Sequence, residues 1–374
     1  METKQQYKVF DWLRFPLIVG VVLIHSFGNS FDFEALDFLH LSGIDCYNIF
    51  RVSISKVLTH VCVPTFYFIS GYLFFKGLET WDVESYKQKL KRRVKTLLVP
   101  FLIWNTISIL NAVKGYLLRG EWNSVLTFLG DNGYVHLYWD CQAWNLDRVN
   151  WVGGAIPASS PYLIPLWFLR DLMIVVICAP VLYYVFKKLR IWGVVMFLIC
   201  YISGVFIPIP GFSTMAFLFF GSGAFMKMNN INPLEFTQRW RYPFLVVALI
   251  AWVTCTMLNG HETQLGNLIY PVYVISGVIT LMNVAIYLVS TNKLQTMSSP
   301  LLSRGSFFIY LSHTILILPI CMRVSSVIFG QTTALQMTIA YIAAPAMAVI
   351  ICIILYYILR RFTPSLCGIL TGER

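Results

Sequence analysis

Two ionisable side chains lie within one apolar stretch near the start of the chain. Arg14 and His25 are eleven residues apart, and residues 15–24 between them are almost entirely apolar. Eleven steps of about 100° return a helix to within about 20° of the same face, which stacks the two side chains about 16 Å apart. Titratable groups inside a bilayer are costly and usually face a bundle interior or a wet cavity. A lone residue of this kind is most simply structural, but two on one face, with Asp11 beside them, favour a functional site.

The types of these side chains suit the transfer of an acyl group to a hydroxyl. A histidine can take the proton from the attacking oxygen, a carboxylate can fix the tautomer of that imidazole, and a cation can stabilise the tetrahedral oxyanion. We assign catalysis to His25 as the general base, Asp171 as the orienting carboxylate and Arg14 as a cation. The sequence has no P-loop, GxSxG, HExxH or cysteine-based metal motif, so we expect neither a metal nor a tightly bound cofactor.

A second pair of charges, Arg170 and Asp171, lies in the apolar segment 163–186. We expect this segment to enter from the outer face, so the pair and His25 can share a level in the membrane. Adjacent residues point about 100° apart on a helix, so the two charges need not pair with each other. Two charges that are neutralised by different helices remain an equally good interpretation.

Two further polar side chains, Tyr310 and His313, are i, i+3 neighbours and therefore share one helix face. We expect them nearer the cytoplasm than His25, because the apolar segment that carries them begins at about residue 306. Alone, His313 is more often a satisfied interior histidine than a catalyst, but it and His60 are the next bases to consider after His25. The substrate contacts that we predict come from Trp167, Asn105, Arg170, Tyr310 and His313.

The loop 76–96 is the most basic of the chain and ends in a cluster of lysines and arginines over residues 89–95. Such a cluster can set the orientation of the protein in the membrane and contact anionic lipids. It can equally hold the phosphates of a cytoplasmic nucleotide donor such as coenzyme A, because arginine and lysine suit phosphate oxygens. In the second interpretation Arg92, Arg93 and Lys95 bind the donor.

The longest outward loop, 119–162, is rich in aromatic residues and also carries three aspartates. Aromatic side chains at this level usually form an interfacial belt, but with carboxylates they can also form a platform for sugar rings. This loop holds Cys141, and the outward loop 29–56 holds Cys46. A disulfide between these two cysteines is an open alternative that their spacing does not support.

The composition is that of a polytopic membrane protein. The chain has 374 residues, of which 57% are hydrophobic and 12% charged, and its mean hydropathy is +0.69. A soluble domain carries about 25% charged residues. The net charge of +11 does not indicate nucleic-acid binding, because the basic residues are spread over short loops, as the positive-inside rule predicts.

We predict an all-α protein in which residues 1–374 form a single transmembrane domain with about ten spans. One set of loops, together with both termini, holds 20 lysines and arginines and the other set holds 6, so both termini are expected to be cytoplasmic. The first span has no small-residue cleavage site after it, so we expect it to be retained. The predicted spans are 9–28, 57–75, 97–118, 163–186, 191–208, 212–226, 243–259, 268–289, 306–328 and 335–359.

Five short motifs, taken in order, resemble the acyltransferase 3 family of bacterial integral-membrane O-acyltransferases. The first is Asp11-Trp12-Leu13-Arg14 followed by His25, since the family carries an arginine, ten residues and a histidine. The chain has Arg92-x-x-Lys95 where the family has Arg-x-x-Arg. The other three motifs are Val63-Pro64 with Ser70-Gly71, then Leu166-Trp167-Phe168-Leu169, then Ile309-Tyr310-Leu311-x-His313.

This resemblance implies a function and its partners. The family moves acyl groups, here most simply acetyl, from cytoplasmic acyl-CoA to sugar hydroxyls of cell-envelope polysaccharides or lipid-linked glycans. Acyl-CoA is then a co-substrate, the glycan is the acceptor, and the protein is a multi-pass protein of the bacterial inner membrane. No nucleic acid is expected as a partner, and a homo-oligomer is left open.

Two other functions compete with this one. A transporter or flippase of a lipid-linked glycan or small anion would also have kinked helices and intramembrane charges, although no inverted repeat is evident. A purely structural membrane partner would not explain two ionisable side chains on one face of the first span.

Overall fold

The computed structural model describes residues 2–28, 36–37, 39–78, 80–130, 133–144, 158–205, 209–260, 263–291 and 299–372. Within these residues the fold is almost entirely helical, as the sequence predicts. A short antiparallel pair of strands, β1 and β2, joins Gln142–Trp144 to Ala158–Ser160, with Ala143 opposite Ser159. The treatment of residues 1–374 as one domain stays a prediction.

The described elements before β1 are helices and helical turns, of which α6 and α7 lie in the predicted outward loop. Their bounds are α1 Glu2–His25, α2 Gly43–Arg51, η1 Val52–Val57, η2 Leu58–Val61, α3 Cys62–Phe74, α4 Val83–Arg93, η3 Val94–Leu98, α5 Val99–Leu118, α6 Trp122–Gly130 and α7 Gly133–Trp139.

The described elements after β2 are all helices or helical turns, joined by short connections. They are η4 Ile164–Leu166, α8 Trp167–Ile177, α9 Ala179–Leu189, α10 Ile191–Ile202, α11 Thr214–Met228, α12 Pro233–Arg239, α13 Arg241–Met257, α14 Gln264–Ser290, α15 Pro300–Ser312, η6 His313–Ile317, α16 Leu318–Phe329, α17 Ala334–Phe362 and α18 Pro364–Thr371.

The predicted spans fall on helices, but fewer than ten of these helices are long and apolar enough to cross a bilayer by themselves. Among the described residues five helices are, and up to seven if the bent pairs α8–α9 and α12–α13 each count as one span. The helices α10 and α11 are shorter, and α1 carries Lys8, Asp11 and Arg14 within its length. These helices indicate a multi-pass membrane protein. The ten crossings and the cytoplasmic location of both termini stay predictions.

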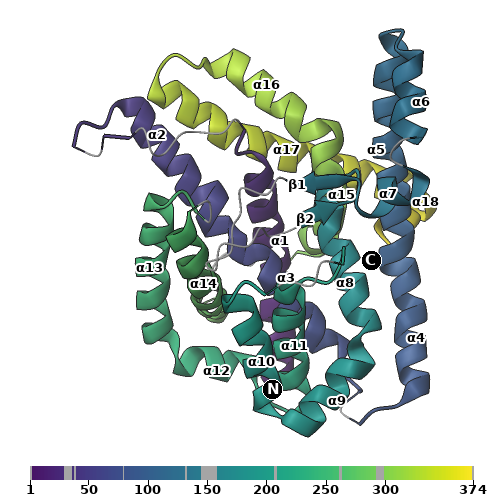
Figure 1. Ribbon diagram of the computed structural model, residues 1–374, viewed down its shortest axis with the longest axis vertical. Coiled ribbons are helices and arrows are strands. Elements are labelled where there is room, and N and C mark those ends of the chain that lie inside the picture. The colour runs from purple at the N-terminus through teal and green to yellow at the C-terminus, as the bar shows by residue number, and fades with distance from the viewer. Residues whose placement is uncertain are drawn as a thin grey trace.

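The first helix, α1, runs through the middle of the molecule (Figure 1). It contacts α3, α14, α15 and α17 as well as the turns η1 and η2. The reason lies in its sequence, because apolar residues four apart along one side, Val9, Leu13, Leu17 and Val21, are all buried. The helix that carries Arg14 and His25 is thus surrounded by protein rather than lipid on much of its surface.

Close helix packing fixes α3 against α11. A Cβ atom at Gly71 would lie 2.0 Å from the carbonyl oxygen of Phe220, and one at Gly223 would lie 2.2 Å from that of Phe68. Only glycine allows the two backbones to come this close, as is common between membrane helices. Gly71 of the Ser-Gly motif therefore acts in packing, and α3 continues through it without a break.

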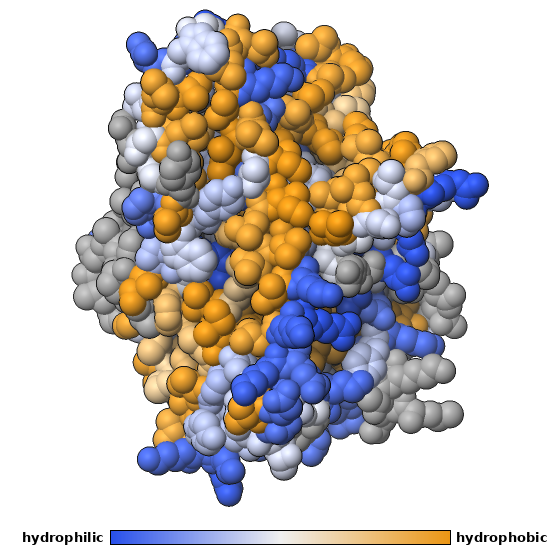
Figure 2. Space-filling view, turned by 90° about the vertical axis from the view of Figure 1, so that its right-hand side faces the viewer, coloured by the Kyte–Doolittle hydropathy of each residue, from blue (hydrophilic) through white to orange (hydrophobic). Residues whose placement is uncertain are grey.

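The basic segment before the third predicted span is not a loop, which corrects the sequence analysis. Residues 83–118 form one helical run in which α4, η3 and α5 follow each other without interruption. Asp82 caps its start by accepting a hydrogen bond of 2.8 Å from the backbone nitrogen of Ser85. Figure 2 shows the result, a band of hydrophilic residues in the lower half of this face, at the height of α4, below a broad apolar surface.

Candidate active site

The structure brings His25 and His313 together. His25 is the last residue of α1, His313 is the first residue of η6, and their ring centroids are 5.3 Å apart at an angle of 52°. The expectation that His313 lies nearer the cytoplasm is therefore wrong. The helix that carries it begins at Pro300, six residues before the predicted start, which raises His313 by about 9 Å.

The hydrogen bonds of His313 determine its tautomer. Its Nδ1 lies 2.9 Å from the carbonyl oxygen of Ile309 and 3.0 Å from that of Tyr310. Carbonyl oxygens can only accept, so Nδ1 carries the proton and Nε2 keeps a lone pair. That Nε2 atom is buried and has no hydrogen-bond partner among the described residues. His313 also opens a π-helical turn, a feature that is frequent at functional sites.

A third histidine lies near this pair. His60, in the turn η2, is hydrogen bonded through Nδ1 to the hydroxyl of Tyr270, and the two rings meet edge to face at 5.7 Å. The turn η2, which carries His60, packs against α1, which carries His25. From the sequence, His60 is only a reserve base and Tyr270 is not predicted, because nothing in either segment indicates that α14 meets η2.

Arg14 has a partner within its own helix. Its Nη1 lies 3.1 Å from Oδ1 of Asp11, and the two side chains are 40% and 48% exposed. Since α1 is continuous from Glu2 to His25, the eleven-residue spacing does place Arg14 and His25 on one side of the helix. Arg14 is therefore three turns from the imidazole pair and cannot touch the same atom of a bound substrate.

Arg170 and Asp171 do pair with each other, in the interior. The guanidinium lies 2.9 Å from Oδ1 of Asp171 and donates to the carbonyl oxygens of Trp139, at 2.7 Å, and Ser159, at 3.0 Å. Both charged side chains are almost completely buried. Among the described residues the carboxylate of Asp171 pairs with Arg170 and makes no hydrogen bond or ion pair with His25, so the structure gives no support to Asp171 as the partner of that imidazole.

Three of the predicted substrate-binding residues lie in the framework around these charges. The Tyr310 hydroxyl donates to the carbonyl oxygen of Pro165, just before α8. Asn105 is fully buried, donates to the carbonyl of Leu137 at 2.9 Å and accepts from the backbone nitrogen of Leu163 at 2.8 Å. Trp167 is half-buried and packs against the core. The polar atoms of Tyr310 and Asn105 thus bind main chain and hold the outward loop to the bundle.

The predicted donor-binding residues lie at the other end of α1. Arg92 and Lys95 are exposed, and the half-buried Arg93 lies over the ring of Phe74 at 5.8 Å. In the same cluster Lys89 donates to the carbonyl of Lys76 at 2.8 Å, and the Lys76 ammonium lies over the ring of Tyr7. Tyr7 is 18 residues before His25, which corresponds to about 27 Å along the helix.

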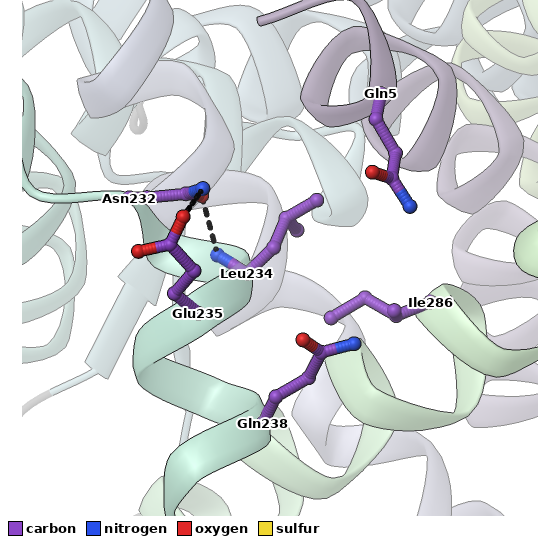
Figure 3. A pocket seen from close by; sticks show the side chains of 6 residues that line it. All are labelled: Gln5, Asn232, Leu234, Glu235, Gln238 and Ile286. Atoms are coloured by element: carbon purple, nitrogen blue, oxygen red, sulfur yellow. Dashed lines mark hydrogen bonds between the residues drawn. The ribbon is translucent and has the colours of Figure 1, made fainter. Parts of the chain in front are cut away.

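A small hollow between the start of α1, α12 and α14 does not belong to this chemistry (Figure 3). Its side chains carry no histidine and no basic group, and Asn232 donates to Glu235 at 2.7 Å within it. The residues that line it are Gln5, Asn232, Leu234, Glu235, Gln238 and Ile286.

Two other expectations concern the outward loop. Cys46 and Cys141 are both free thiols, so the structure has no disulfide between them. The sugar platform can be followed only in part, because Trp151 lies outside the described residues. Among the described aromatics, Trp122 is exposed and Trp139 is half-buried beside Arg170.

Comparison with known proteins decides the class of the chain. A family model described as an acyltransferase domain matches residues 7–357. The chain belongs to the acyltransferase 3 family. It is also 26% identical over 375 residues to the succinoglycan biosynthesis protein ExoH of Rhizobium meliloti (strain 1021). The aligned region covers 97% of this chain and 91% of that protein. No solved structure gave a significant match.

The resemblance drawn from the five motifs is thereby confirmed, since all of them lie within the matched residues. An imidazole can accept a proton from a hydroxyl, and the two imidazoles that the structure brings together are those of His25 and His313. The cations Arg14 and Arg170 already have carboxylate partners. The structure therefore assembles an imidazole pair at the end of α1, and it assembles a separate buried ion pair at the start of α8.

Proposed function

We propose that this acyltransferase moves an acyl group from cytoplasmic acyl-CoA to a sugar hydroxyl of a cell-envelope polysaccharide or a lipid-linked glycan, at the bacterial inner membrane. The observation that carries the proposal is the contact between His25 and His313 inside a helical membrane protein of an acyltransferase family. The similarity to a protein of succinoglycan biosynthesis supports a glycan as the acceptor.

The chemical step follows from the position of His25. Its imidazole accepts the proton of the acceptor hydroxyl while the oxygen attacks the thioester carbonyl. A new O–C bond forms, the tetrahedral intermediate collapses, the C–S bond breaks, and the thiolate takes the proton back from the imidazolium. Arg14 is about 16 Å lower on α1, so it serves the path of the donor rather than the reacting carbonyl.

The donor has to span the distance between two ends of α1. The cluster that includes Arg92, Arg93 and Lys95 is joined to the start of α1 through Lys89, Lys76 and Tyr7, about 27 Å of helix away from His25. That separation is close to the thickness of the hydrocarbon core, about 30 Å. We infer that the nucleotide binds at the cytoplasmic surface and that the pantetheine arm extends along the Arg14 side of α1. In a bilayer the half-exposed pair of Arg14 and Asp11 needs hydration, and we infer that the path of the pantetheine arm along this side of α1 is hydrated.

The direct test uses membranes that contain the protein and a labelled donor. Acetyl-CoA with label in the acetyl group is supplied on the cytoplasmic side, and longer acyl-CoA donors follow. We expect label in glycan, in an ester that mild base releases. Glycan that crosses the membrane without gaining label from any donor would instead favour the transporter.

The predicted orientation of the protein in the membrane is tested separately. A reporter fused after Arg374 should be active only in its cytoplasmic form, because the basic residues divide 20 to 6 between the two sides. Activity of a periplasmic reporter at that position would overturn the ten-span arrangement.

A further inference from the structure

A buried nitrogen with no partner is the most unusual polar atom near the site. The Nε2 atom of His313 belongs to a side chain with 0% exposure and is unpaired among the described residues. Buried polar atoms in proteins nearly always have a partner, so each exception requires an explanation. The other unpaired buried atoms of the described residues are threonine hydroxyls, which can rotate toward a neighbour. The imidazole of His313 cannot, because two main-chain carbonyls hold its Nδ1.

The nearest ring that could supply the missing hydrogen belongs to His25. An N–H···N hydrogen bond of about 2.9 Å between two imidazoles places their ring centres roughly as far apart as the 5.3 Å observed here. This bond is not made in the structure, since Nε2 of His313 has no partner among the described residues. His25 is the half-buried last residue of α1, so its ring can rotate, whereas the ring of His313 is fixed.

We propose that His313 is the positioning partner of His25, and that an imidazole here takes the place that a carboxylate holds in other acyl-transfer sites. The proposal rests on the proposed function. The Nε2 lone pair of His313 accepts the N–H of His25, which fixes the His25 tautomer and directs its bare nitrogen at the acceptor hydroxyl. During transfer the proton moves from the hydroxyl to His25 and then to the thiolate, so His313 ends each turnover unchanged.

The other titratable groups around the pair do not offer the same arrangement. His60 approaches from η2, but its Nδ1 is hydrogen bonded to Tyr270. Asp171, on α8, is paired with Arg170. Of His60, Asp171 and His313, only His313 has a buried acceptor that is held in place and has no hydrogen-bond partner among the described residues.

The test is a double-mutant cycle between the two histidines. We expect His313→Asn to lower kcat by about 10- to 100-fold, as the loss of an orienting partner does elsewhere, and to leave the KM for the donor unchanged. Residues that act as a unit are not additive, so His25→Ala with His313→Asn should be no slower than His25→Ala alone. A structural role would lower kcat by the same factor in both backgrounds, and that result would overturn the proposal.

Two further variants keep the test decisive. Ser312→Ala is the matched control, since its buried hydroxyl bonds the carbonyl of Phe308 at 2.8 Å and is the immediate neighbour of His313; we expect kcat within about twofold. In His313→Asn the amide nitrogen can still donate to the main-chain carbonyls in place of Nδ1, but the shorter side chain places no acceptor at the position of Nε2. If His313→Asn does not accumulate in the membrane, His313→Ala replaces it, because it lacks the same acceptor.

The pH profile separates positioning from packing. On the acidic side of the pH profile, kcat falls as His25 becomes protonated. Loss of the partner should change the pH at which this fall occurs, whereas a packing defect would lower kcat at every pH by the same factor. A fall at the unchanged pH in His313→Asn would contradict the proposal. A wild-type protein that transfers no acyl group from any donor would overturn the proposed function and this inference with it.

Discussion

Two polar clusters lie inside the helical bundle, and they differ in how their hydrogen-bonding groups are used. The guanidinium of Arg170 binds Asp171 and two main-chain carbonyls, so its charge and most of its donors are satisfied. In the imidazole pair, Nε2 of His313 has no partner among the described residues, and no hydrogen bond to His25 is found there either. The first cluster has its hydrogen bonds made, and the second still has an open acceptor.

This difference distinguishes groups that hold the fold from groups that can react. A buried charge is stable only when it is paired and hydrogen bonded, and Arg170 meets that condition while it fastens the ends of α7 and β2 to α8. A proton acceptor that must take a hydrogen from a substrate has to be available before the substrate arrives. We therefore assign structure to Arg170 and Asp171, and chemistry to His25 with His313.

The largest effect is expected at His25. Removal of a positioned general base typically costs about 10²- to 10⁴-fold in rate, so His25→Ala should lose acyl transfer by that factor while it still inserts into the membrane. His25→Gln should fail as well, because it keeps size and hydrogen bonding but not basicity. The measurement is the initial rate of label transfer per amount of protein in the membrane.

The wild-type pH dependence belongs to the same prediction. Only the neutral imidazole can take the proton, so the rate should rise with pH until His25 is deprotonated and then level off. If His25→Ala kept most of its activity, the assignment of the chemistry to the imidazole pair would be wrong. His60 would then be the next base to test.

A smaller effect on rate but a large one on stability is expected at Asp171. Asp171→Asn leaves the buried Arg170 without its counter-charge, and breaking such a pair by removing one partner costs about 3–5 kcal/mol. We expect a lower melting temperature in detergent, while kcat per folded molecule falls less than about tenfold, since Asp171 does not contact His25. The reverse result, a stable variant with kcat reduced like that of His25→Ala, would make Asp171 part of the chemistry.

The smallest effect is expected at the basic cluster on α4. Replacement of both Arg92 and Arg93 by alanine should raise the KM for acyl-CoA by about tenfold and leave kcat nearly unchanged, because the phosphates are bound equally in the ground and transition states. Steady-state kinetics with varied donor measure this directly. An unchanged KM in correctly inserted protein would leave the cluster with its role in membrane orientation alone.

Some features of this protein follow from local sequence alone. The apolar composition and the basic bias of the loops determine a helical membrane protein, and the helical repeat determines that Arg14 and His25 share one side of α1. The order of the five motifs determined the family. Each of these depends on neighbours within one segment, so no knowledge of packing between helices was needed.

The composition of the site was decided by the tertiary structure. His25 meets His313 because α15 begins at Pro300, and a shift of its start by one turn would move His313 by about 5 Å along the bundle. Arg170 and Asp171 pair, and are buried, because the main chain of α7 and β2 folds over them. Sequence periodicity fixes which side of a helix a residue occupies, whereas its height and its partners depend on where every neighbouring helix begins and how deeply it packs.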